Sequence, residues 1–277
     1  MMWTLFEPVH AVTYFAPAAR AAFEAANLRG FWRGYFAGRA APLGAVGPAP
    51  VTASFFSFAP RMVERALPDV WTRADPATAL LARLDGARAS LAALTDDGAG
   101  DRTDVAEAAE LLREAADGLP TVGRPLGAAN AALPWPDDPL GVLWHATTIL
   151  REHRGDGHVA ALLVAGLEGA QTPVWRSSLD GRRAALQPAR GWTDDEWEDA
   201  AARLRDRGWL AADGTATDAG RAVRDEVEAT TDRLAAEPWD RLGPTRTARL
   251  RTVLHPLAGR AYASLPDVYP IGLPAPV

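Results

Sequence analysis

A short polar segment lies between two apolar stretches near the middle of the chain. Residues 151–158 contain six polar or ionisable side chains, separated only by Gly155 and Gly157. We call this set the polar cluster; its members are Arg151, Glu152, His153, Arg154, Asp156 and His158. The flanking residues 139–150 and 159–167 are mostly apolar, and burying an unpaired charge costs several kcal/mol. The polar cluster is therefore predicted to be paired, hydrated or functional.

The residue types of the polar cluster indicate acid–base chemistry beside an anion site. Histidine titrates near neutral pH and carboxyl groups transfer protons, so His153, His158 and Asp156 are the candidate catalytic residues. Arginine binds carboxylates and phosphates through paired hydrogen bonds, so Arg151 and Arg154 are candidate ligand-binding residues. No Ser-His-Asp order, glycine-rich nucleotide loop or paired-carboxylate motif accompanies them. The sequence thus assigns neither a reaction type nor a cofactor.

Structural roles for the same residues remain open. We expect one helix over residues 139–153 and a second over 157–168, with Asp156 as the N-cap of the second. The arginines can pair with Glu152 or with a helix C-terminus. Each residue taken singly is explained by such a role, whereas the density of the whole cluster favours a functional site.

A cavity is predicted to join the polar cluster to the N-terminal segment. The glycines let the chain turn between the two expected helices, so that His153, His158 and Arg154 can point into one space. His10 and Tyr14 lie in an apolar N-terminal segment and are the ligand-binding residues expected to reach this space. A buried imidazole such as that of His10 needs a hydrogen-bond partner.

Aromatic residues indicate a pocket wall. Seven aromatic side chains lie within residues 31–58. Core packing explains most of them, but aromatic side chains around a few polar groups are also the usual lining of a small-molecule site. Trp32, Phe55, Arg61 and His145 complete the candidate ligand-binding set.

The composition excludes several functional classes. The chain has no cysteine and no lysine, which removes thiolate catalysis, cysteine-ligated metals, Schiff-base lysines and the P-loop lysine. A net charge of −6 argues against a general nucleic-acid binder. The N-terminus lacks the basic region of a signal peptide, and no apolar run approaches the roughly 20 residues of a membrane span. We therefore expect a cytoplasmic protein that has no membrane partner.

Helical spacing and helix caps dominate the remaining sequence. Helices are expected to begin at Pro17, Pro76, Asp194 and Asp218, because prolines or Thr caps precede apolar positions at helical spacing. Only residues 209–217 are expected to form a two-stranded ribbon or less. The predicted domains are an N-terminal helical domain (1–118), a Pro/Gly-rich connection (119–138), a winged-helix-like domain (139–265) and a Pro-rich tail (266–277).

The order of elements over residues 139–235 resembles the winged-helix module of MarR-type regulators. One expected helix ends in Leu204, Gly208, Trp209 and Leu210, and the next begins with the Thr-Asp-Ala-Gly segment 217–220. The resemblance implies a mainly α fold whose C-terminal part is a degenerate winged helix with a very short wing.

The whole chain also resembles an actinobacterial helix-turn-helix family. The stretches that carry this resemblance are RAAPLG, FSFAPRMVERALPDVW and LREHRGDGHVAAL. It implies the architecture and leaves the chemistry open.

The expected recognition helix is acidic where a DNA reader is basic. Residues 194–199 hold five acids, which would repel phosphate groups, so duplex DNA is not an expected partner. Arg182, Arg183 and Arg190 form a basic loop just before this helix. That loop keeps a DNA-binding alternative open.

Three functions follow from these observations. The leading prediction is a winged-helix-like protein that binds an apolar or anionic small molecule between the N-terminal helices and the polar cluster, with conversion of that molecule left open. The alternative is a ligand-responsive DNA-binding transcriptional regulator. The third is a metal- or haem-dependent enzyme that uses His10, His153 and His158, although their spacing is not the i,i+4 pair of a zinc helix and no metal ligand is assigned.

Overall fold

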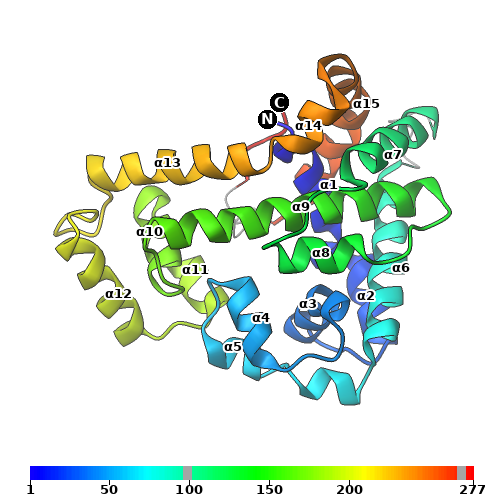
Figure 1. The fold of residues 1–277 in the computed structure, drawn as a ribbon. Helices are drawn as coiled ribbons and strands as arrows, with labels where there is room; N and C mark the ends of the chain where they lie inside the picture. Colours follow the sequence, from blue (N-terminus) through cyan, green and yellow to red (C-terminus); the bar gives the residue numbers. More distant parts are fainter. Residues whose placement is uncertain (96–101, 267–272) are drawn as a thin grey trace.

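The computed structural model describes residues 1–95, 102–266 and 273–277. These residues form fifteen α-helices, two short 3-10 helices and no β-strand (Figure 1). The prediction of a mainly α fold is therefore confirmed. No helix among the described residues combines the length and the apolarity that crossing a lipid bilayer requires.

Prolines fix where many helices of the N-terminal half begin. A proline at the first helical position supplies a suitable φ and lacks an N–H that would have no partner there. The predicted starts at Pro17 and Pro76 are confirmed. The elements are α1 (Trp3–Phe15), α2 (Pro17–Ala25), α3 (Phe31–Ala40), η1 (Ala41–Leu43), α4 (Pro48–Phe55), α5 (Pro60–Glu64), η2 (Asp69–Thr72), α6 (Pro76–Thr95), α7 (Arg102–Ala116) and α8 (Pro125–Ala131).

The longest helix, α9 (Pro139–Val164), runs through the middle of the molecule (Figure 1). Asp138 caps it by accepting a hydrogen bond from the N–H of Gly141 at 2.8 Å. Helices α1, α6, α7, α8 and α13 all pack against it. Packing on several sides explains why residues 141–150 are buried around the whole circumference of the helix.

The predicted break between two helices at Gly155 and Gly157 is wrong, because the chain stays helical through both glycines. A glycine inside a helix costs only about 1 kcal/mol relative to alanine, and the packing around α9 offsets that. At Gly157 a Cβ atom would lie 2.8 Å from Nη1 of Arg124, so the glycine allows a close approach. Asp156 therefore cannot cap a new helix. It accepts a hydrogen bond from the N–H of Gly127, in the first turn of α8, at 2.8 Å.

The second half of the chain adds six helices, of which two begin at predicted caps. The hydroxyl of Thr193 accepts a hydrogen bond from the N–H of Glu196, and the Glu196 carboxylate accepts one from the N–H of Thr193 at 2.9 Å. Thr217 caps the following helix by accepting a hydrogen bond from the N–H of Gly220 at 3.1 Å. The helices are α10 (Gln171–Asp180), α11 (Arg183–Arg190), α12 (Asp194–Asp206), α13 (Asp218–Leu234), α14 (Glu237–Leu242) and α15 (Pro244–Ala263).

The turn between α12 and α13 contains a single antiparallel bridge, from Leu210 to Ala216. This agrees with the prediction of a two-stranded ribbon or less at residues 209–217. Gly220 lets α13 approach this turn, because a Cβ atom there would lie 2.3 Å from the carbonyl oxygen of Trp209. The prediction of a loop before Thr193 is wrong in part, since α11 forms there and buries Leu186 in the core.

Three large hydrophobic clusters form the core of the described residues, and α9 contributes to the first and the third. The first joins its N-terminal half to α1, α7 and α15, and the second contains α3, α4 and α5. The third joins the C-terminal end of α9 to α10, α12 and α13. Residues of both predicted domains share the first cluster, and the predicted domain boundaries stay a prediction. Of the predicted tail, residues 267–272 lie outside the described residues.

Candidate functional site

A cavity of about 680 Å³ opens between the aromatic helices of the N-terminal part and the C-terminal half of α9. We call it the aromatic cavity. One wall consists of Trp32 and Tyr35 on α3 together with Phe55 and Phe58, and neighbouring rings of this wall are 5.7 to 6.3 Å apart between centroids. Side chains of α10, α11 and α13 line further parts of it, together with Met1, Trp3 and Pro274. The chain thus surrounds the cavity with segments that are far apart in sequence.

The backbone next to this wall is held in a rare conformation. Phe56, which also lines the aromatic cavity, has φ 58° and ψ −58°. A bulky residue with positive φ is strained, and such strain concentrates at binding and catalytic sites. Gly169 packs directly on this turn, because a Cβ atom there would lie 2.7 Å from the carbonyl oxygen of Phe56. The strained turn is therefore fixed by the segment that follows α9.

One face of α9 lines the cavity with Arg151, Gly155, His158 and Leu162. Residues seven positions apart on a helix differ by about 20° around its axis and by about 10 Å along it. Arg151 and His158 therefore face the same space from two turns apart. Gly155 lies between them and leaves that part of the helix surface without a side chain.

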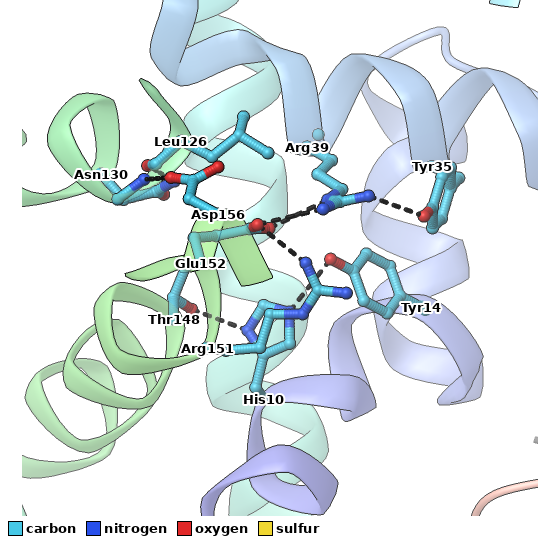
Figure 2. Close-up of polar contacts among 12 residues, drawn as sticks. His10, Tyr14, Tyr35, Arg39, Leu126, Asn130, Thr148, Arg151, Glu152 and Asp156 are labelled. Atoms are coloured by element: carbon cyan, nitrogen blue, oxygen red, sulfur yellow. Dashed lines mark hydrogen bonds and ion pairs between the residues drawn. The ribbon is translucent and has the colours of Figure 1, made fainter. Parts of the chain in front are cut away.

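Arg39, Glu152 and Arg151 meet at the Arg151 end of the cavity (Figure 2), and Oε2 of the buried Glu7 lies 3.7 Å from Nε of Arg151. Nε and Nη2 of Arg39 donate to the two carboxylate oxygens of Glu152 at 2.9 and 3.0 Å, and Nη1 of Arg151 donates to Glu152 at 2.7 Å. Burial alone would raise the pKa of Glu152, but the guanidinium groups of Arg151 and Arg39 hold that pKa well below its usual range. Glu152 therefore stays ionised and fixes both guanidinium groups at the cavity, which both arginines line.

A chain of hydrogen bonds runs from the cavity into α9 (Figure 2). The hydroxyl of Thr148 donates to the carbonyl oxygen of Trp144 and lies 2.9 Å from Nδ1 of His10. Nε2 of His10 lies 3.0 Å from the hydroxyl of Tyr14, which lines the cavity. Burial and the neighbouring Arg151 lower the pKa of His10 well below its usual range. His10 is thus a neutral ring behind Tyr14.

At the other end of the same α9 face, His158 contacts α13. Its Nδ1 lies 2.9 Å from the hydroxyl oxygen of Thr231, which is fully buried. Burial lowers the pKa of His158, and the charges of Glu228 and Arg154 act on it in opposite directions. The His158 ring is therefore neutral near pH 7.

The lining of the aromatic cavity carries more positive than negative charge. Five arginines and two carboxylates line it, although the whole chain has a net charge of −6. The guanidinium group of Arg39 lies 4.0 Å from the ring centroid of Phe55, and that of Arg190 lies 4.5 Å from Phe58. Cations over aromatic faces keep the wall both apolar and electropositive. Such a surface suits an aromatic or apolar molecule with an anionic group.

His153 and Arg154 do not line the aromatic cavity, so the prediction of one shared space is wrong for both. They line a separate pocket of about 180 Å³ beside the start of α1. Because α9 is unbroken, His153 points about 140° away from His158 around the helix axis. Arg154 is drawn to α13, where it pairs with Glu228 at 3.3 Å and Asp232 at 3.0 Å.

The structure brings only some of the other predicted ligand-binding residues to the aromatic cavity. Tyr14, Trp32, Phe55 and Arg151 line it with His158, and His10 lies directly behind Tyr14. The structure shows where these side chains lie, and their role in binding a ligand stays a prediction.

His145, Asp156 and Arg61 lie away from the cavity in packing or pairing positions. His145 is buried with its ring edge-on to Trp135 at 4.9 Å between centroids, and burial lowers its pKa to about 4. Asp156 accepts a hydrogen bond from the N–H of Gly127 in α8, and its burial raises its pKa to about 6. Nη1 of Arg61 donates to Glu196 at 2.9 Å and so joins α5 to the first turn of α12.

The described residues contain no group of three or more His, Asp or Glu side chains that could hold a metal ion. His158 lines the aromatic cavity, His10 lies behind Tyr14 outside that lining, and His153 lines the other pocket. The three histidines proposed as ligands of a metal or haem therefore do not converge on one point.

The site residues predicted from the sequence did not include Arg39, Tyr35 and Thr231. Arg39 and Tyr35 are four residues apart on α3, and Nη1 of Arg39 donates to the Tyr35 hydroxyl at 3.3 Å. Helical spacing could have placed these two on one face. Nothing in the local sequence indicates that Thr231 contacts His158, because 73 positions separate them.

The fold and the site define an all-α protein in which the aromatic helices α3 and α4 line a cavity together with α9, α10, α11 and α13. Over residues 1–270 the chain matches a family described as a helix-turn-helix family, and it belongs to that family. No match was found among curated proteins or among solved structures.

Proposed function

We propose that this protein binds a small amphipathic anion, an aromatic or apolar molecule with a carboxylate, phosphate or sulfonate group, in the aromatic cavity. The observation that carries the proposal is one cavity of about 680 Å³ that combines a continuous aromatic wall with five arginines. Sites for small molecules have volumes of about 300–1,000 Å³ and are mostly apolar with a few oriented polar groups.

The buried ion pairs at the Arg151 end support a fixed place for the anion. Glu152 orients Arg39 and Arg151 before any ligand arrives, so binding would not have to order those long side chains. Pre-oriented donors strengthen binding mainly by reducing this entropic cost. The Tyr14 hydroxyl, backed by His10, adds a polar group at the same end.

A pair of matched fluorescent probes tests the proposal. The probe 8-anilinonaphthalene-1-sulfonate carries an anionic group, and N-phenyl-1-naphthylamine has the same ring system without it. We expect the sulfonate to bind at one site per chain and more tightly than the amine, and Arg224→Gln to reduce that preference. Arg224 lines the cavity from the exposed face of α13, so its replacement does not disturb the core. Equal affinity for both probes, or binding without a defined stoichiometry, would contradict the proposal.

A ligand-responsive regulator is the second candidate, and one connection favours it. The strained segment beside the cavity is tied to α11 by a hydrogen bond from the N–H of Ala59 to the carbonyl oxygen of Arg190 at 2.9 Å. Arg61 then joins the adjacent α5 to the N-terminus of α12. A ligand that moved this segment would move α11 and α12. Such a regulator would bind a specific duplex with an affinity that changes when the sulfonate probe occupies the cavity, which an electrophoretic mobility shift would measure.

The regulator candidate has an electrostatic difficulty. Arg183 of the basic segment is engaged by Asp194 at 3.2 Å and by Glu198, both on α12. Arg182 pairs with Asp180 at 3.1 Å. The acids at the start of α12 thus take up positive charge that a phosphate backbone would need. Small-molecule binding without DNA recognition therefore remains our first proposal.

A further inference from the structure

The same arrangement holds two histidines in this molecule. The hydroxyl of Thr148 on α9 and the hydroxyl of Thr231 on α13 each donate to the carbonyl oxygen four residues earlier on their own helix, at 2.9 and 2.7 Å. Each of these hydroxyl oxygens also lies 2.9 Å from the Nδ1 atom of a histidine, His10 for the first and His158 for the second.

This arrangement decides which ring nitrogen carries the hydrogen. A hydroxyl has one hydrogen, and in both threonines that hydrogen is already donated to a carbonyl. With that hydrogen on the carbonyl, the hydroxyl oxygen accepts from the ring, which favours the tautomer protonated on Nδ1 in His10 and in His158. Because burial lowers the pKa of both rings, each stays neutral near pH 7, and Nε2 is an unprotonated acceptor.

The two histidines differ in what their Nε2 atoms meet. Nε2 of His10 accepts a hydrogen bond from the hydroxyl of Tyr14 at 3.0 Å. Among the described residues, no donor is bonded to Nε2 of His158. The His158 ring lines the aromatic cavity, whereas Thr231, to which its Nδ1 is bonded, is fully buried outside the lining. The acceptor edge of the ring is therefore directed to the cavity.

We propose that Nε2 of His158 accepts a hydrogen bond from a hydroxyl or N–H group of the ligand. This inference rests on the proposed function and narrows its ligand class. Arg151 and His158 share one face of α9 about 10 Å apart along the axis, with only Gly155 in the cavity lining between them on that face. The ligand is thus an elongated aromatic or apolar anion with a hydrogen-bond donor at the end remote from its anionic group.

The first test measures the tautomer and needs no ligand. Long-range ¹H–¹⁵N correlation spectra of the whole ¹⁵N-labelled chain distinguish the two neutral imidazole tautomers. We expect both His10 and His158 to carry hydrogen on Nδ1. Thr231→Val should remove this fixed tautomer at His158 only, with His10 as the internal control. A wild-type His158 that carries its hydrogen on Nε2 would refute the inference whatever ligand binds.

The second test compares 6-hydroxy-2-naphthoate with 2-naphthoate, which lacks the distal hydroxyl. We expect wild-type protein to bind the hydroxy compound about 2- to 10-fold more tightly, the range that one net hydrogen bond gives. His158→Phe should abolish this preference, and calorimetry measures it. Equal binding of the two compounds by the wild type would overturn the inference and leave the proposed function intact. Binding of neither compound would count against the proposed function, while the tautomer measurement would still decide the role of His158.

Discussion

Replacing Gly155 with leucine should stabilise the protein and weaken ligand binding at the same time. Gly155 lies inside α9 and lines the aromatic cavity between Arg151 and His158. A Cβ atom there would meet only Oε2 of Glu152 at 3.8 Å and Nη1 of Arg151 at 3.9 Å, which are ordinary van der Waals distances. The four added carbon atoms therefore enter the cavity without displacing the helix.

The two effects have separate magnitudes. Leucine is a better helix former than glycine by about 0.5–1 kcal/mol at an interior position, and 1 kcal/mol shifts Tm by about 2–4 °C in proteins of about this size. We expect Tm to rise by about 1–4 °C. A ligand forced against the added side chain loses about 1–3 kcal/mol, as overpacked sites do, which is about 5- to 150-fold in Kd.

Gly259→Leu is the matched control. Gly259 lies in α15, and a Cβ atom there would have no heavy atom within 4 Å. It should raise Tm similarly and leave affinity for 8-anilinonaphthalene-1-sulfonate unchanged. The assays are thermal unfolding and fluorescence titration of both variants beside the wild type. If the Gly155→Leu protein binds the sulfonate as tightly as the wild type does, the ligand does not lie beside Gly155. If its Tm falls, the cavity has no room for a leucine side chain at this position.

Three further outcomes follow from the charges. Glu152→Gln should lower the free energy of unfolding by about 3–5 kcal/mol in urea titrations, because buried Arg39 would lose its carboxylate partner and Arg151 would keep only Glu7, at 3.7 Å; a change under 1 kcal/mol would contradict this. Stability should fall as the pH is lowered from about 6.5 to 4, since burial lowers the pKa of His145 and His153 to about 4 while the unfolded chain takes up protons. Burial raises the pKa of Asp156 to about 6, so the contribution of Asp156 to stability falls as the pH rises through that window. Asp156→Asn should therefore make the loss of stability between pH 6.5 and 4 steeper. Calorimetry of the wild type and the variant at several pH values measures both effects. Random duplex DNA should not bind with submicromolar affinity at physiological salt, and a mobility shift lost in an Arg182→Ala, Arg183→Ala double variant would overturn that expectation.

Local signals predicted much of the fold. Proline at the first helical position, as at Pro17 and Pro76, and threonine caps at Thr193 and Thr217 act through the nearest backbone groups, so they can be read without tertiary contacts. The short turn at 209–217 was predictable for the same reason. The error at Gly155 and Gly157 has the opposite cause. Glycine weakens a helix locally, and packing from several helices, which the sequence does not display, keeps α9 continuous.

The candidate site was predictable only where one helix carries it. His158 and Arg151 were identified because they lie in one dense segment, and the unbroken helix then separated His153 from them by its periodicity. The pairing of Glu152 with Arg39 could not be predicted from the sequence, since the two residues are 113 positions apart. Contacts at that separation depend on how α3 docks on α9, and that docking depends on the whole aromatic wall.

The polar cluster shows why pairing and function are not alternatives here. A buried ion pair contributes little net stability compared with apolar side chains of the same size, because desolvation offsets most of the attraction. Pairing alone therefore gives a weak reason for placing Arg39, Glu152 and Arg151 in this core. A binding role would explain their arrangement. Glu152 holds the guanidinium groups of Arg39 and Arg151 at the cavity, where an anion can reach them, and its negative charge balances them in the core. The same carboxylate that makes the cluster structurally acceptable is then what makes the cavity a fitting site for an anionic ligand.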